Sequence, residues 1–201
     1  MPYRTTNSRC AIILKNLEPI PEETIITILQ KRGLEIIDID IISIARKCIG
    51  ESKYLRGAKL SQAPNFFDCS SFVKWLYSHK GIWLPRRSIQ QRQLGEVVEI
   101  NQLTAGDVVF SSGRINYYLE DQTDSVGHEG IYTGQGTIIH AANAKSGIIE
   151  SPIEKFIGKN FRGARRYFPK DKKAITCQIP AELEIEGDDD IKWIILQSLY
   201  N

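Results

Sequence analysis

Hydrophobic residues recur at intervals of three and four residues in three early stretches of the chain. These stretches are residues 25–29, 41–48 and 72–77. Such spacing places apolar side chains on one face of a helix and therefore predicts three helices, the third beginning near Asp68 and ending before Gly81. Cys48 lies on the apolar face of the second helix, so we expect a buried, structural thiol there.

From Gly106 onward the pattern changes to short runs of β-branched and aromatic residues separated by glycines. Runs of this length and composition predict strands. Helices followed by strands favour an α+β fold in which helices pack on a central antiparallel sheet. The predicted strands are Val108–Phe110, Val126–Tyr132, Thr137–Ala141, Ile148–Ile149 and Ala164–Phe168.

The two ends of the chain differ from the middle. The acidic residues 188–190 precede an apolar stripe over residues 191–199, which favours a short amphipathic helix. We expect this helix to dock on its own domain, with partner binding as the less favoured alternative. The expected organisation is an N-terminal extension with one helix at 1–36, a main domain at 37–169 and a C-terminal tail at 170–201.

Composition excludes several classes of protein. The 201 residues suffice for one domain with appendages, and a content of 42% hydrophobic and 25% charged residues is ordinary for a globular chain. The net charge of +2 gives no electrostatic reason to expect nucleic acid as a partner. No apolar run is long enough to span a bilayer. The run Cys10–Leu14 is too short for a secretory signal, so a cytoplasmic location, export by another route and a removed signal all stay open.

Cys69 is the cysteine most suited to chemistry, because the first turn of a helix favours a thiolate. Asp68 can cap that helix, but its charge opposes the thiolate, so a nearby imidazolium is expected to offset it. The alternative is that Cys69 is an inert small hydrophobic residue. The cysteines at 10, 48, 69 and 177 are too dispersed for a zinc site.

Two of the three histidines suit a site with Cys69. His128 opens a predicted strand between glycines, and His140 ends the next strand, twelve residues later across a turn at residues 134–136. The imidazoles of neighbouring antiparallel strands could then meet. In a Cys–His–His arrangement Cys69 attacks a carbonyl, His128 handles the proton and His140 orients His128. His79 lies at a helix end, where a cation merely complements the dipole. A metal site is disfavoured, since no second thiol or carboxylate is at hand.

Several blocks of the sequence, in this order, closely resemble the NlpC family of papain-like cysteine peptidases, which cut the peptide part of the bacterial cell wall. The resemblance covers roughly Ile41 to Phe168. The matching blocks are Phe67–Val73, Leu84–Ser88 with Gln91, Ala105–Phe110, Gly127–Tyr132 and Ile139–Ala141.

The resemblance implies a papain-like α+β fold without metal or cofactor. It implies hydrolysis of peptidoglycan stem-peptide bonds, of the D-glutamyl type, through an acyl-thioester, with stem peptides or muropeptides as partners. Cys69 matches the nucleophile, His128 the base and His140 the orienting third member. The candidates for substrate binding are Tyr54, Asp68, Ser70, Arg86 and Ser88, for which packing, capping or loop-fixing roles are the alternatives.

The sequence departs from the family pattern at three places. Gly57-Ala58-Lys59 replaces the usual paired glycines after Tyr54. Glu129 stands where the family carries an apolar residue, although strand alternation turns it away from His128. Residues 117–125 look like a polar insertion, either a flap over the cleft or a plain surface loop.

Two other functions remain as alternatives. The same thioester chemistry could serve a thiol-dependent acyltransferase or a lipid or protein deacylase. A non-catalytic wall-binding module could grip anionic polymer through the basic run Lys159, Arg162, Arg165, Arg166 and Lys170, although a solvated surface is the simpler interpretation of that run. Asp107 is expected to tie a turn rather than to touch substrate.

Overall fold

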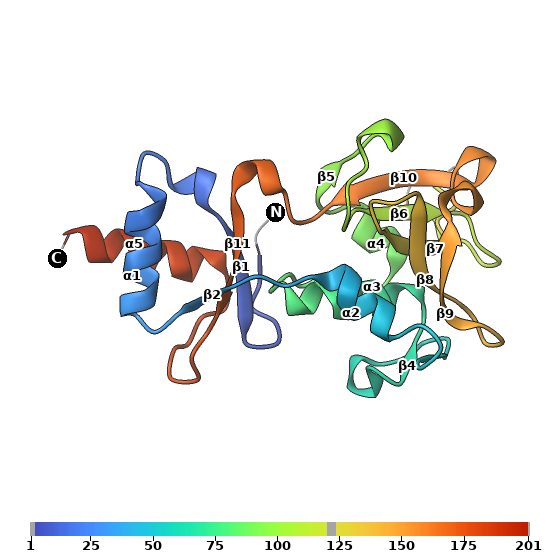
Figure 1. Ribbon diagram of the computed structural model, residues 1–201, viewed down its shortest axis with the longest axis horizontal. Coiled ribbons are helices and arrows are strands. Elements are labelled where there is room, and N and C mark those ends of the chain that lie inside the picture. Colours follow the sequence, from blue (N-terminus) through green and yellow to red (C-terminus); the bar gives the residue numbers. More distant parts are fainter. Residues whose placement is uncertain (1–2, 120–123, 201) are drawn as a thin grey trace. The chain divides into compact units, whose positions relative to one another are not determined.

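The computed structural model describes residues 3–119 and 124–200, except for the side chain of Lys170. The chain divides into two compact units. The first unit combines Met1–Ile39, Tyr77–Trp83 and Phe168–Asn201, and the second combines Asp40–Leu76 and Leu84–Tyr167. Figure 1 labels most helices and strands of both units.

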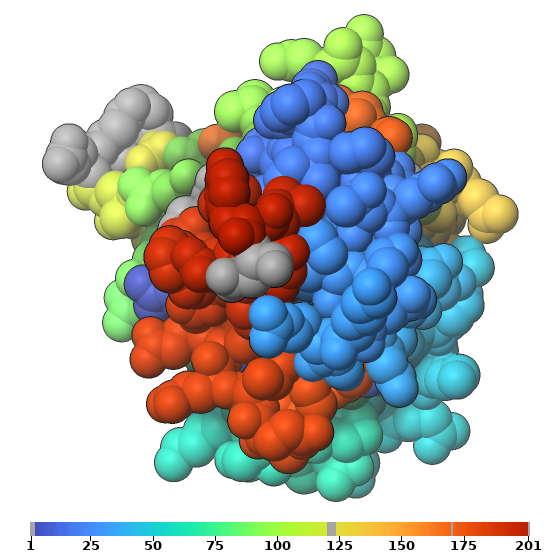
Figure 2. Space-filling model, turned by 90° about the vertical axis from the view of Figure 1, so that its left-hand side faces the viewer, coloured from blue at the N-terminus to red at the C-terminus, as the bar shows by residue number. Residues whose placement is uncertain are grey.

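The first unit joins the two ends of the chain in one antiparallel sheet. Its strand order is β1 (Arg9–Ile13), β11 (Ala174–Gln178) and β2 (Glu35–Ile37). Helix α1 (Glu22–Lys31) contacts helix α5 (Asp188–Tyr200), and Figure 2 shows the blue N-terminal segments beside the red C-terminal helix. The amphipathic helix predicted for the tail is therefore confirmed, and so is the helix predicted around residues 25–29.

The second unit is built on a six-stranded antiparallel sheet. Its strand order is β5 (Glu96–Val97), β10 (Phe161–Arg166), β6 (Val108–Ser111), β7 (His128–Tyr132), β8 (Thr137–Asn143) and β9 (Gly147–Pro152). The remaining elements are α2 (Ile41–Lys47), α3 (Cys69–His79), α4 (Ser88–Arg92) and the short parallel pair β3 (Lys53–Tyr54) and β4 (Phe66–Phe67). The strands predicted after Gly106 and the helix predicted from Asp68 are confirmed in type, although the last strand begins three residues earlier and ends two residues earlier than predicted.

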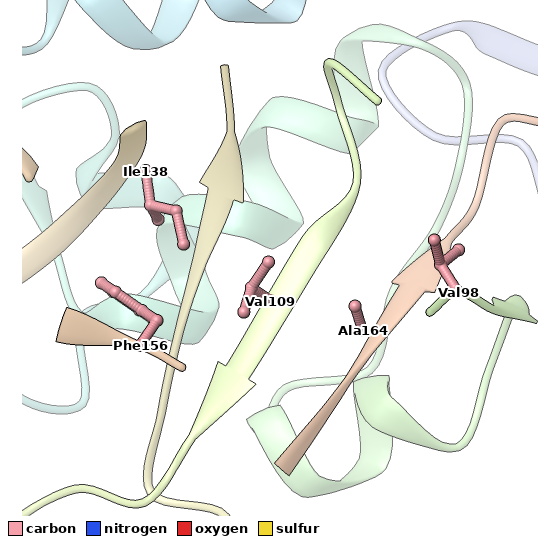
Figure 3. Packing of buried hydrophobic residues seen from close by; sticks show 5 residues of the cluster. All are labelled: Val98, Val109, Ile138, Phe156 and Ala164. Atoms are coloured by element: carbon pink, nitrogen blue, oxygen red, sulfur yellow. The ribbon is translucent and has the colours of Figure 1, made fainter. Parts of the chain in front are cut away.

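Buried apolar side chains fill one face of this sheet. Val109, Ile138 and Ala164 from three of its strands pack with Val98 and Phe156, as Figure 3 shows. All five are at most 5% exposed, and Ile138 anchors β8, the strand that carries His140, in this cluster.

Two local predictions about the fold can be compared with the structure. Cys48 is buried, as predicted from its position on the apolar face. Asp107 accepts a hydrogen bond from the Thr104 amide at 2.7 Å and so ties a turn, as predicted. It also accepts two hydrogen bonds from Arg166, at 2.9 and 2.8 Å, so this member of the basic run is paired rather than solvated.

No helix within residues 3–119 and 124–200 has both the length and the apolar character required to cross a membrane.

Candidate active site

Cys69 is the first residue of α3, and the residues before it explain why the helix starts there. The Asp68 carboxylate accepts a hydrogen bond from the Ser71 amide at 2.9 Å, which is the predicted cap. The Ser71 hydroxyl lies 2.9 Å from the Asp68 amide and accepts its proton. This reciprocal cap presents the Cys69 thiol, which is only partly buried, at the helix N-terminus.

The two imidazoles of the second unit are neighbours, as the twelve-residue spacing predicted. Strands β7 and β8 pair antiparallel, with Ile131 opposite Ile139. Nε2 of His128 lies 2.8 Å from Nδ1 of His140, a hydrogen-bond distance. The turn between the strands depends on Gly134 and Gly136, whose φ angles are +85° and +76°.

Glycine at position 130 permits the close approach of β8 to β7. A Cβ atom there would lie 2.4 Å from Cγ2 of Ile138 and 2.8 Å from Cβ of His140. At position 127 a Cβ atom would lie 2.3 Å from the carbonyl oxygen of Ile115. The small residues around His128 therefore leave room for its neighbours, as the sequence suggested.

Two residues that hold the histidines were missed in the sequence. The Ser151 hydroxyl lies 3.1 Å from Nε2 of His140, on the side away from His128. The Phe156 ring stacks on His128 at 5.4 Å and meets the edge of His140 at 4.9 Å. Ser151 belongs to β9, where Ile149 is the residue opposite His140. Only the register of β8 and β9 identifies Ser151, and no local motif encodes that register.

Burial keeps both imidazoles neutral at pH 7. It lowers the pKa of His128 to about 4. The pKa of His140 is lowered to about 3, first by burial and then by the charges of His128 and Lys155. The expectation of a resting imidazolium beside Cys69 is thus wrong, because desolvation disfavours the charged ring more than any neighbouring carboxylate favours it.

The thiol also rests in its neutral form. Burial raises the pKa of Cys69 most, and the charges of Glu129 and Asp68 raise it further. The backbone N–H groups of Ser70 and Glu129 act in the opposite direction and lower the pKa of the thiol. Since Glu129 directly follows His128 at the start of β7, this interaction brings the sulfur close to the start of that strand. The arrangement suits a thiol that gives up its proton to an imidazole as it attacks, rather than a preformed ion pair.

The thiol and both imidazoles line a cleft of about 1130 Å³, together with all five predicted substrate-binding residues. Arg86 donates to Asp68 through two nitrogens, at 3.1 and 2.5 Å, and to the Ser70 hydroxyl at 2.9 Å. Burial raises the pKa of Tyr54, and Cys69 and Asp68 raise it further. Ser88 is buried at the edge of the cleft.

Other residues considered in the sequence lie elsewhere. His79 belongs to the first unit, where its Nδ1 lies 3.3 Å from Arg9. Glu129 is fully buried and is not among the residues that line the cleft. Residues 120–123 of the polar insertion at 117–125 lie outside the described part of the chain. The flap interpretation therefore stays a prediction.

A thiol on the first turn of a helix and a histidine pair on an antiparallel sheet define a papain-like α+β domain. The chain belongs to the NlpC/P60 family, whose profile matches residues 51–166. The resemblance proposed from the sequence blocks is thereby confirmed.

Relatives support this assignment. The chain is 39% identical to a probable endopeptidase of Corynebacterium glutamicum over 115 residues, which is 57% of this chain and 47% of that protein. It is 35% identical to a gamma-D-glutamyl-L-lysine dipeptidyl-peptidase of Bacillus cereus over 106 residues, 51% of this chain and 29% of that protein. The chain thus spans less than half the length of these relatives.

A solved structure has the same fold. An NlpC/P60 family protein from Bacillus cereus matches with a TM-score of 0.54 and 28% identity, over 65% of this chain and 40% of that one. The α+β, papain-like class predicted from the sequence is confirmed.

Proposed function

We propose that this protein is a cysteine peptidase that hydrolyses peptidoglycan stem peptides at D-glutamyl linkages. The observation that carries the proposal is the cleft in which Cys69, on a helix N-terminus, lies with His128 and its partner His140. The activities for which the relatives are named, those of an endopeptidase and of a gamma-D-glutamyl-L-lysine dipeptidyl-peptidase, support the same chemistry and the same linkage.

In the proposed reaction Sγ of Cys69 attacks the carbonyl carbon while its proton passes to Nδ1 of His128. The carbon–nitrogen bond then breaks as His128 returns that proton to the leaving amine, and the acyl group stays on sulfur as a thioester. A water molecule, deprotonated by His128, attacks the thioester. The acid product leaves and the thiol regains its proton, so the enzyme is unchanged.

His140 is proposed as the orienting residue. When His128 carries the extra proton, its Nε2–H donates to Nδ1 of His140, which must then be an acceptor. The lowered pKa of His140 favours this neutral form. The Ser151 hydroxyl can accept from Nε2–H of His140 and so select the required tautomer. Ser151 would then act through His140 rather than on the substrate.

The experiment is product identification from a defined peptide, L-Ala-γ-D-Glu-L-Lys. We expect mass spectrometry to detect L-Ala-D-Glu and free L-lysine with the unaltered chain and no product with Cys69→Ala. The matched control is Cys48→Ala, which removes a thiol outside the cleft and keeps activity. Intact peptide with the unaltered chain, or equal cleavage by Cys69→Ala, would reject the proposal. Transfer of the acyl group to an added amine in preference to water would favour the acyltransferase alternative.

A further inference from the structure

The cleft concentrates positive charge that the chain as a whole does not have. Five basic residues and one acidic residue line it, whereas the net charge of the whole chain is +2. The acidic residue is Asp68, and the basic residues are Arg56, Arg86, Arg87, Arg114 and Lys155.

Most of this charge is not neutralised by the protein itself. Asp68 is engaged by Arg86, so this pair adds little net charge. Arg56, Arg114 and Lys155 are exposed, and none of them forms a salt bridge with another described residue. Arg87 lies over the Tyr117 ring, with 5.4 Å between guanidinium carbon and ring centroid, and keeps its charge.

Two of these cations act electrostatically on residues of the candidate site. Arg56 precedes Gly57, whose amide donates to Asp68 at 2.9 Å, and its charge lowers the pKa of Tyr54 against the larger effect of burial. Lys155 also lines the cleft, and its charge helps to lower the pKa of His140. Positive charge therefore acts on the tyrosine near the thiol and on the second histidine.

We propose that Arg56, Arg114 and Lys155 make the cleft selective for γ-glutamyl peptides that carry free carboxylates beside the scissile bond. Peptides in which the glutamyl α-carboxylate is replaced by an amide would be poorer substrates. This inference rests on the proposed function and names the charge state of its substrate. In a γ-linked glutamate the side-chain carboxyl group forms the peptide bond, so the α-carboxylate stays free and lies near the bond that breaks. Guanidinium groups bind carboxylates through paired charged hydrogen bonds, and a cleft lined by one sign of charge attracts the opposite sign.

The test compares two tripeptides, L-Ala-γ-D-Glu-L-Lys and its glutamyl α-carboxamide, in kcat/KM. We expect the unaltered chain to prefer the carboxylate by roughly tenfold or more, since hydrogen bonds between charged groups are strong, and the preference to shrink as salt is raised. The variant Arg56→Gln/Arg114→Gln/Lys155→Gln should lose about tenfold on the carboxylate peptide and little on the carboxamide. The matched control, Lys15→Gln/Lys31→Gln/Lys47→Gln, removes the same charge from exposed sites outside the cleft and should keep the preference.

The inference would be overturned, and the proposed function left intact, by either of two results. One is equal cleavage of both peptides by the unaltered chain, and the other is an equal loss of kcat/KM on both peptides in the triple variant of Arg56, Arg114 and Lys155. If neither peptide is cleaved, the proposed function fails. The binding of both peptides to Cys69→Ala, measured by calorimetry, then decides the inference, because tighter binding of the carboxylate form supports it and equal binding overturns it.

Discussion

Replacing Glu129 by glutamine should stabilise the protein increasingly as the pH rises. Glu129 is fully buried on β7, and neither carboxylate oxygen has a hydrogen-bond partner among the described residues. Burial raises its pKa well above the usual value of 4.5, Asp68 adds to the rise, and Arg86 opposes it. The folded protein therefore favours the neutral carboxylic acid at this position.

The magnitude follows from the proton that folding must take up. In the unfolded chain a glutamate with a pKa near 4.5 is ionised at pH 7, so folding costs about 1.4 kcal/mol for every pH unit above 4.5 until the folded pKa is reached. Because the folded pKa is raised, stability is greatest below pH 4.5 and is lost as the pH rises. The loss grows in this way until the pH reaches the raised pKa of the folded protein.

The assay is urea-induced unfolding of the unaltered chain and Glu129→Gln at pH 4, 5, 6 and 7. The difference in unfolding free energy should grow with pH in favour of the variant, by at most about 1.4 kcal/mol for each pH unit above 4.5. Glu150 provides a control of opposite sign, because a hydrogen bond from Thr137 lowers its pKa, so Glu150→Gln should lose relative stability as the pH rises. A difference for Glu129→Gln that stays constant from pH 4 to 7 would refute the reasoning.

Three further predictions concern packing, the charged pair and the thiol. Gly130→Ala should lower stability by about 1–3 kcal/mol in urea unfolding, since its Cβ would lie 2.4 Å from Cγ2 of Ile138; an unchanged midpoint would contradict the packing. Asp68→Asn should lower the free energy of unfolding by about 1–2 kcal/mol in the same assay, because it weakens the helix cap and leaves Arg86 without its carboxylate. The loss is limited because solvent screens this partly exposed arginine, and an unchanged stability would contradict the account. Alkylation of Cys69 by iodoacetamide should be slow at pH 7 and accelerate at alkaline pH, since burial raises the pKa of the thiol, whereas a fast rate that is constant down to pH 5 would indicate a preformed ion pair.

The parts of the site that the sequence predicts are those encoded locally. Asp68 and Ser71 cap a helix within four residues, and this cap alone places Cys69 on the first turn. The glycines at 134 and 136 permit a tight turn, so the spacing of the two histidines translates directly into neighbouring strands. Short-range geometry of this kind needs no knowledge of the rest of the fold.

The parts that the sequence did not predict depend on pairing between distant segments. Strands β1 and β11 join the two ends of the chain, and each is a run of five residues without a distinctive alternation. The support of His140 by Ser151 depends on the register of β8 and β9. The neutral state of His128 follows from its burial, which no motif reveals. Glu129 was visible as a departure from the family pattern, but only the structure places it in the interior, where its carboxylate oxygens have no hydrogen-bond partner within residues 3–119 and 124–200.

The most direct test of the central claim is to look for the acyl-enzyme itself. The protein, in excess, is mixed with a γ-D-glutamyl anilide and quenched in acid within milliseconds, and its mass is then measured intact and after digestion into peptides. The account predicts an acyl adduct carried by the peptide that contains Cys69, one equivalent of released aniline, and neither signal with Cys69→Ala. Release of aniline without an adduct, at a rate that Cys69→Ala retains, would contradict it.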